Sequence, residues 1–138
     1  MTHPFQVCLS IQVKTYDTDY AGVVSNLVYL RWLEDLRLAL LDAHFPLQGQ
    51  LAQGYTPVLR RTEIDYRRPV RLFDPVIGRM WLPKVSPMKW YISAEFEVEG
   101  SLVATAEQVG AFLDLNTWKP IPVPPDFARG FSSGGLAT

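Results

Sequence analysis

The chain has 138 residues, which suits one compact domain, residues 1–138, with its own buried core. Its 48% hydrophobic and 20% charged residues are typical of a globular protein, and a net charge of −1 argues against nucleic-acid binding. A single cysteine, Cys8, excludes an internal disulfide and suits a reducing compartment, so we expect a cytoplasmic protein. Polar and apolar residues alternate from position 5, so we expect neither a signal peptide nor a membrane span.

The first expected element is a half-buried β-strand over residues 5–14. Apolar residues stand there at every second position, namely Phe5, Val7, Leu9, Ile11 and Val13. The period then changes, and apolar residues recur at steps of three or four from about Ser25 to His44. This pattern predicts a helix with one face against a core. About 20 residues at ~1.5 Å each give a rod of about 30 Å, long enough to cross a small sheet.

The second half of the chain is expected to be strands. After a loop with Gly49 and Gly54, the pattern predicts strands over residues 58–66, 76–82, 90–98 and 102–113, with a tight turn at 99–101. No helices alternate with them, which favours an antiparallel α+β fold. We expect the proline-rich residues 120–125 to be extended and a frayed tail over about 128–138.

The most informative segment lies between the first strand and the long helix. Asp17 and Asp19 stand there beside a turn glycine, Gly22. A carboxylate near the free N–H groups of a helix start can attack a carbonyl or activate water against it, and those N–H groups can hold the oxyanion. Capping and turn formation would explain the aspartates equally well.

The spacing of residues in this segment resembles a known family. The pattern D-x-D-x-x-G-x-V-x-x-x-x-Y-x-x-x-x-E-x-x-R, from Asp17 to Arg37, is similar to the signature of the 4-hydroxybenzoyl-CoA thioesterase family of hotdog-fold proteins. A second block, residues 64–76, resembles the family's Y-x-x-P…D-x-V, and the likeness runs from about Ile11 to Phe127.

The resemblance implies a five-stranded antiparallel sheet wrapped around one long helix. It also implies a homodimer or a dimer of dimers (a homotetramer), with active sites at the subunit interface. Asp19 is then the catalytic carboxylate, as nucleophile or general base, and Asp17 braces the turn. The backbone N–H of Asn26 is the oxyanion donor, and Gly22 lets the backbone approach the thioester.

The same resemblance implies that Val24, Ser25 and Tyr29 contact the substrate, although a helix–sheet contact explains Tyr29 equally well. The Ser25–Asn26 pair is more similar to long-chain acyl-thioester members than to aromatic-acyl members. The acyl group therefore stays open between an aromatic and a fatty one.

Basic residues are concentrated between Arg60 and Lys89. Coenzyme A carries phosphates, so Lys84 and Lys89 are candidates to bind it, while a solvated strand face is the alternative. An acidic acyl-carrier protein would suit the same surface. Glu34 and Arg37 are spaced for an ion pair on the helix surface. A solvated face is the simpler interpretation of two further carboxylates, Glu63 and Asp65.

The sequence predicts an acyl-CoA or acyl-carrier-protein thioesterase. The alternative is a non-catalytic module that binds acyl thioesters on the same fold. His3 and His44 have no surroundings that suit a catalytic triad, and no cluster of Cys and His supports a metal site. We expect no cofactor, because coenzyme A is part of the substrate.

Overall fold

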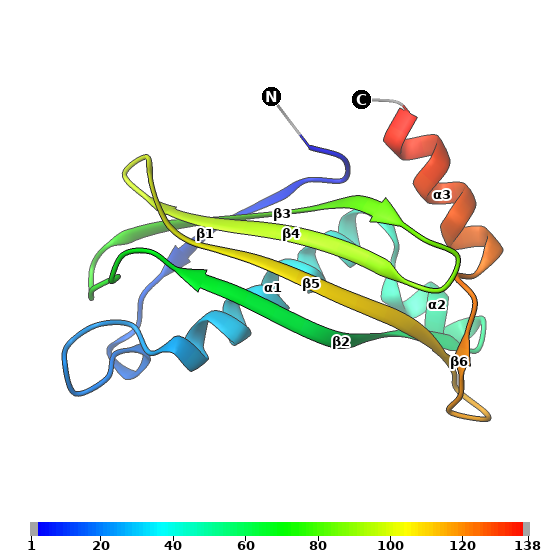
Figure 1. Ribbon diagram of the computed structural model, residues 1–138, viewed down its shortest axis with the longest axis horizontal. Helices are drawn as coiled ribbons and strands as arrows, with labels where there is room; N and C mark the ends of the chain where they lie inside the picture. The colour runs from blue at the N-terminus through cyan, green and yellow to red at the C-terminus, as the bar shows by residue number, and fades with distance from the viewer. Residues whose placement is uncertain (1–2, 137–138) are drawn as a thin grey trace.

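The computed structural model describes residues 3–136, and the side chains of those up to residue 133 (Figure 1). One antiparallel sheet packs against one long helix. The elements, in chain order, are β1 (Val7–Gln12), η1 (Thr15–Asp17), α1 (Asn26–His44), α2 (Leu47–Ala52), β2 (Tyr55–Tyr66), β3 (Pro75–Val85), β4 (Trp90–Val98), β5 (Ser101–Asp114), β6 (Pro120–Ile121) and α3 (Pro125–Leu136).

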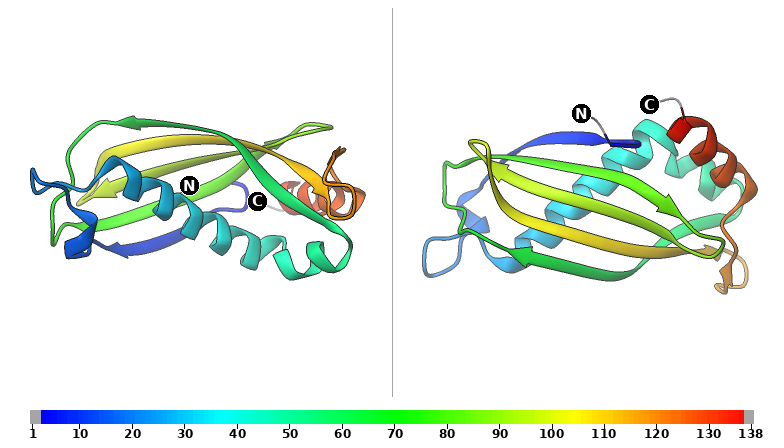
Figure 2. Two further views of the ribbon diagram at one scale, coloured as in Figure 1. Left: turned by 90° about the horizontal axis from the view of Figure 1, so that it is seen from below. Right: turned by 45° about the horizontal axis from the view of Figure 1, so that its top comes forward.

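The strand order in the sheet is β1-β3-β4-β5-β2, with the short β6 paired to the end of β5. Every pair is antiparallel. The sheet curves around α1, which crosses one face diagonally, and the other face carries no helix among residues 3–136 (Figure 2). This is the hotdog arrangement that the sequence predicts. No helix in this range is long and apolar enough to cross a bilayer.

The long helix forms where the sequence predicts it, because its apolar stripe meets the inner face of the sheet. Leu33 and Leu36 are completely buried on α1, and Phe96 of β4 is completely buried opposite them. Full burial of each such side chain stabilises the fold by about 1.5–3 kcal/mol relative to exposure. The hairpin between β4 and β5 also matches, since Glu99 and Gly100 both have positive φ (50° and 84°), as a two-residue primed turn requires.

One contact in the core leaves no room for a side chain. Trp90 of β4 lies over Gly110 of β5, and its Nε1–H donates to the Ala111 carbonyl (3.0 Å). A Cβ on Gly110 would lie 1.8 Å from the Trp90 ring and 2.3 Å from the Val58 carbonyl oxygen. A side chain at position 110 would therefore require the Trp90 ring or the neighbouring strand to shift.

Two expectations for the loops are wrong. The segment with Gly49, expected to be a loop, contains α2. Residues 120–124 are extended as expected, with β6 at Pro120–Ile121, but the tail expected to be frayed belongs to α3 over Pro125–Leu136. Residues 137 and 138 lie outside the described range. Phe127 holds α3 in place, with its ring centroid 4.2 Å from that of Phe45 and 5.0 Å from that of Phe112. Tertiary packing therefore overrides a sequence poor in helix-forming residues.

Candidate functional site

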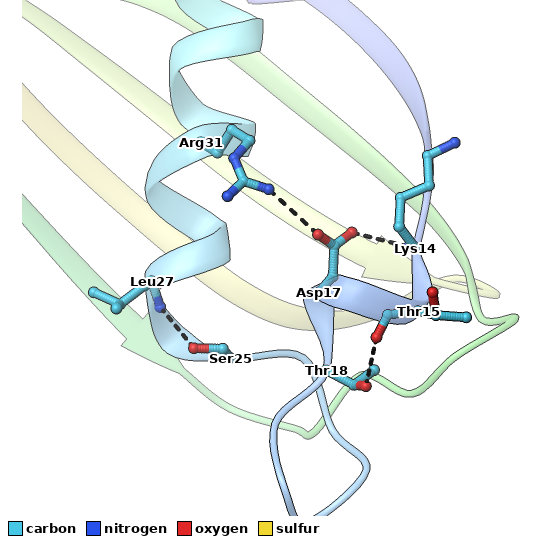
Figure 3. Close-up of polar contacts among 7 residues, drawn as sticks. All are labelled: Lys14, Thr15, Asp17, Thr18, Ser25, Leu27 and Arg31. Carbon is cyan, nitrogen blue, oxygen red and sulfur yellow. Dashed lines mark hydrogen bonds and ion pairs between the residues drawn. The ribbon is translucent and has the colours of Figure 1, made fainter.

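Asp17 is buried and braces the entry to α1. The residue is 2% exposed, and Oδ2 accepts a hydrogen bond from the Lys14 N–H (2.9 Å). Oδ1 lies 3.4 Å from Nη1 of Arg31 on α1, as Figure 3 shows. The Asp17 carbonyl accepts from the Ser25 N–H (2.9 Å). Asp17 thus joins η1 to the first turns of α1, which is the bracing role that the sequence predicts.

Asp19, by contrast, is exposed in the turn that follows. Its N–H donates to the Val23 carbonyl (2.8 Å), and its carbonyl accepts from the Gly22 N–H (3.0 Å). Oδ1 accepts from the N–H groups of Ala21 (2.8 Å) and Val23 (3.4 Å). Oδ2 accepts no hydrogen bond from residues 3–136, so one oxygen is held by the backbone and the other is available to a ligand. Gly22 has φ of 78°, which fits its expected turn role.

Val24 fastens this loop to the rest of the molecule. Its side chain is buried in the core, and its N–H donates to the Val70 carbonyl (2.7 Å). Isolated bridges pair Thr18 with Val24 and Val23 with Arg71. The loop between Thr18 and Ser25 projects away from α1 (Figure 3). The structure therefore gives the Val24 side chain a packing position rather than one open to substrate.

The start of α1 presents a free backbone donor. Ser25 is the N-cap and its hydroxyl oxygen accepts from the Leu27 N–H at 3.4 Å. Asn26 is exposed, and in the described part of the chain no acceptor binds its N–H. Its carbonyl accepts from the Tyr66 hydroxyl of β2 (3.1 Å). The Asn26 N–H lies at the positive end of a 19-residue helix, where it can stabilise a developing anion.

Within one chain the two expected catalytic groups are not joined. The Asp19 carboxylate binds N–H groups of its own turn, and no hydrogen bond among residues 3–136 links it to Asn26. The sequence predicts the Asp19 carboxylate beside the free N–H groups of the helix start, whereas in one chain it accepts from Ala21 and Val23 of its own turn.

Tyr29 lies in an aromatic cluster under the helix start. Its ring is T-shaped to those of Trp32 (5.0 Å between centroids), Tyr66 (5.2 Å) and Phe96 (5.5 Å). Burial, assisted by the neighbouring Tyr66, raises the pKa of Tyr29 to about 12. Tyr29 is therefore a neutral phenol at physiological pH and packs between helix and sheet.

A polar bridge between α1 and the sheet was not expected. Nη1 of Arg37 donates to Oε1 of Gln108 (2.8 Å), and Nε2 of Gln108 donates to the Thr62 hydroxyl (3.0 Å). No ion pair between Arg37 and Glu34 exists in the range described, so the expected helix-surface pair is wrong. Burial lowers the pKa of Arg37, and the charge of Glu34 opposes that shift. The sequence did contain a hint of this bridge, since Gln108 is a polar residue at an inward-facing position of β5.

Lys84 and Lys89 lie far from the Asp19 loop. They flank the turn between β3 and β4, where Val85 pairs with Trp90. Figure 1 shows this turn and the loop before α1 at opposite ends of the sheet. Nζ of Lys84 lies 4.8 Å from the centroid of the Tyr91 ring. A single chain therefore does not bring these lysines to the catalytic residues that the sequence predicts.

Carboxylates neutralise much of the basic stretch on the uncovered face of the sheet. Arg79 pairs with Glu95 (3.3 Å) and with Glu97 (2.5 Å), and the hydrogen bond from Arg79 lowers the pKa of Glu97. Arg61 pairs with Glu63, and Arg67 pairs with Asp65. Glu63 and Asp65 are thus solvated in one chain, as the simpler interpretation expects.

Two hollows line α1. The first, which we call the α1–β2 groove, runs from Asn26 and Tyr66 to Gln108. The second, which we call the inner cavity, has a volume of about 280 Å³ between the C-terminal half of α1, α2, the sheet and Phe127 of α3. Glu34, Arg37 and Leu59 line both hollows, so the groove and the inner cavity adjoin each other along α1.

Comparison with known proteins agrees with this architecture. The model of the family described as "Thioesterase-like superfamily" matches residues 13–131. The chain belongs to the thioesterase-like superfamily. It is 30% identical over 113 residues to the long-chain acyl-CoA thioesterase FadM of Escherichia coli strain K12, covering 80% of this chain and 86% of that protein. It is 25% identical over 123 residues to the acyl-CoA thioester hydrolase YbgC of Escherichia coli O6:H1, covering 88% and 92%.

Solved structures of thioesterases share the fold. The DHNA-CoA thioesterase from Staphylococcus aureus superposes with a TM-score of 0.84 at 22% identity, covering 93% of this chain and 89% of that one. At this identity the likeness shows the hotdog fold alone. The match is to the thioesterase-like superfamily as a whole. It does not identify the chain as a member of the more specific 4-hydroxybenzoyl-CoA thioesterase family that the motif resembles.

Proposed function

We propose that the protein hydrolyses an acyl thioester of coenzyme A or of an acyl-carrier protein. Asp19 supplies the carboxylate, and the Asn26 N–H is the oxyanion donor. The two groups act together in a dimer with its active sites at the subunit interface. The observation that carries the proposal is the exposed Asp19 carboxylate, with one oxygen held by backbone N–H groups and the other available.

The chemistry requires little beyond these two groups. Asp19 either attacks the carbonyl carbon or removes a proton from a water molecule that does so. The carbonyl oxygen becomes an oxyanion, which the Asn26 N–H and the positive end of α1 stabilise. Collapse of the tetrahedral intermediate breaks the carbon–sulfur bond and releases a thiolate, which takes a proton from the protonated Asp19 in the general-base route or from water in the direct-attack route. In the direct-attack route, water then hydrolyses the acyl-aspartyl anhydride.

The surroundings of Asp17 support the choice of Asp19 over its neighbour. Asp17 is buried, and both of its oxygens are already occupied by Lys14 and Arg31. A carboxylate in that position has no free oxygen to present to water or to a thioester. The names of FadM and YbgC, which both refer to acyl-CoA, support the proposed substrate class.

The test is the variant Asp19→Asn. An asparagine Oδ1 can still accept from the Ala21 N–H, so we expect the loop and the unfolding temperature to stay nearly unchanged. Loss of the base or nucleophile should lower kcat by at least ~10²-fold. The measurement is hydrolysis of a panel of aromatic and aliphatic acyl-CoAs, followed by thiol release.

Asp35→Asn is the matched control, because Asp35 is an exposed aspartate on α1, and it should keep full activity. Normal turnover by Asp19→Asn would contradict the assignment. Tight binding of acyl-CoA by the unaltered protein without hydrolysis would instead favour the non-catalytic binding module.

A further inference from the structure

The inner cavity has the properties of a pocket for an apolar chain. Its charged lining residues, Glu34 and Arg37, lie at the end nearer the helix start. Apart from Thr56 the deeper lining is apolar and comes from α1, α2, β2, β3, β4 and α3, with Leu41, Leu47, Met80, Trp90, Ile92 and Phe127 among its members. A ligand with a polar head toward Asn26 and an apolar tail toward α3 would match this distribution.

We propose that the inner cavity holds the tail of the acyl group and that Phe127 closes its far end and so limits the length of the chain. This inference rests on the proposed thioesterase function and deepens it. It assigns the substrate class to extended aliphatic acyl groups rather than to a single aromatic ring.

The dimensions favour an extended chain. Asn26, the proposed oxyanion donor, and Leu41, in the cavity wall, are fifteen residues apart on α1, so about 22 Å of helix separates them. A single aromatic acyl group bound at Asn26 would leave the inner cavity empty. A cavity of about 150 Å³ lined by apolar side chains is large enough for benzene, and the inner cavity, at about 280 Å³, is nearly twice that size.

Phe127 is fixed in position and therefore suited to limit the chain. It is 6% exposed, stacked on Phe45 and in T-shaped contact with Phe112. Both partners belong to the hydrophobic core, so the ring cannot move aside without opening that core. Leu47 of α2 lines the same cavity and is partly buried. A smaller side chain in place of Phe127 would lengthen the cavity, and a larger one in place of Leu47 would fill it.

The experiment compares two cavity variants with two controls. Phe127→Leu lengthens the cavity and Leu47→Phe fills it. The matched controls are Phe131→Leu, which alters the other aromatic residue of α3, and Leu51→Phe, at an exposed leucine of α2. Neither control residue lines the inner cavity. For each protein, kcat/KM is measured across saturated acyl-CoAs of increasing length.

We expect Leu47→Phe to shift the preferred length downward and Phe127→Leu to shift it upward. A single methylene in an apolar pocket changes kcat/KM by roughly 10–200-fold, so the ratio of long to short substrates should change at least ~10-fold. The controls should retain the original profile. An unchanged profile in Leu47→Phe, or equal shifts in the controls, would overturn the inference.

A binding measurement separates this inference from the proposed function. Displacement of a fluorescent fatty-acid probe by fatty acids of increasing length requires no catalysis. If the unaltered protein hydrolyses no acyl-CoA but Leu47→Phe still weakens long-chain displacement, the thioesterase proposal fails and the cavity assignment stands. If hydrolysis occurs but neither displacement nor kcat/KM depends on these residues, the cavity assignment fails alone.

Discussion

At the scale of single residues, position relative to the core decides what each aspartate can do. Asp17 and Asp19 are two residues apart, but a buried carboxylate with two partners stabilises structure, while an exposed carboxylate with a free oxygen is available for chemistry. Arg31 is largely exposed, so solvent weakens its attraction for Asp17. The hydrogen bond from the Lys14 N–H is the better protected of the two contacts.

We predict that Asp17→Asn lowers stability more than activity. Its amide can accept at one oxygen only, so one of the two donors, from Lys14 or Arg31, faces an NH₂ group in a buried position. Such a mismatch costs about 1–3 kcal/mol. Thermal unfolding should show a Tm lower by several degrees while kcat below the transition changes far less than in Asp19→Asn. The reverse pattern, a stable Asp17→Asn protein without turnover, would exchange the two roles.

The bracing contacts of Asp17 were predictable from the sequence, because turn chemistry is local, while the catalytic role of Asp19 stays a prediction. The partner of Arg37 was not predictable. Gln108 is 71 positions away along the chain, and only the pairing of β5 with its neighbours places it under α1. The i,i+3 spacing predicts Glu34 as the partner of Arg37, but Arg37 donates to Gln108 instead.

At the scale of elements, α1 and β4 were predictable because each has an apolar pattern with its own period, and each buries that face. The helices α2 and α3 were not, since both contain glycine, which is a poor helix former. The helical state of α3 depends on contacts with distant rings, such as Phe45 and Phe112 against Phe127.

The approach of Trp90 to Gly110 gives a prediction at this scale. Gly110→Ala would force a methyl group into the Trp90 ring and against the Val58 carbonyl, so the β2–β5 pairing or the ring must move. Overpacking of this kind costs about 1–3 kcal/mol or more. Denaturant unfolding should show a reduced midpoint. Gly49→Ala in α2 is the control, because its Cβ would meet no atom within 4 Å, and its stability should stay equal or increase slightly.

At the scale of the whole molecule, the face that carries the candidate site is unfinished in one chain. β2 is a 12-residue strand with no neighbour on its outer side among residues 3–136. Leu27 and Leu30 on α1 are 75% and 44% exposed beside it, and Leu59 and Tyr66 on β2 are also exposed. A long free edge next to exposed leucines is a surface that another chain can cover.

We predict that this surface forms a dimer and that Leu27→Glu with Leu30→Glu disrupts it. Light scattering at micromolar concentration should give twice the chain mass of 15.6 kDa for the unaltered protein and a lower mass for the double variant, with loss of thioester hydrolysis. Met88→Glu, at an exposed methionine in the turn between β3 and β4, should remain dimeric and active. A stable, fully active monomer of the unaltered protein would contradict both the dimer and the shared active site.

From the charges on the outer face of the sheet, we predict a dimer rather than a dimer of dimers. Glu63 lies directly opposite Glu107 on neighbouring strands, and Asp65 and Glu95 lie in the same shallow depression. Stacking a second sheet there would take these carboxylates out of water at a cost that nearby arginines only partly offset.

The hydroxyl of Tyr66 ties the free edge of the sheet to the carbonyl of Asn26, the residue whose N–H is the proposed oxyanion donor. Any chain that pairs with β2 therefore holds the same tyrosine that steadies the helix start. Formation of the dimer and the geometry of the helix start would then be linked. Dilution below the dissociation constant of the dimer should therefore lower the activity of each subunit, which would not happen if the two subunits were independent enzymes.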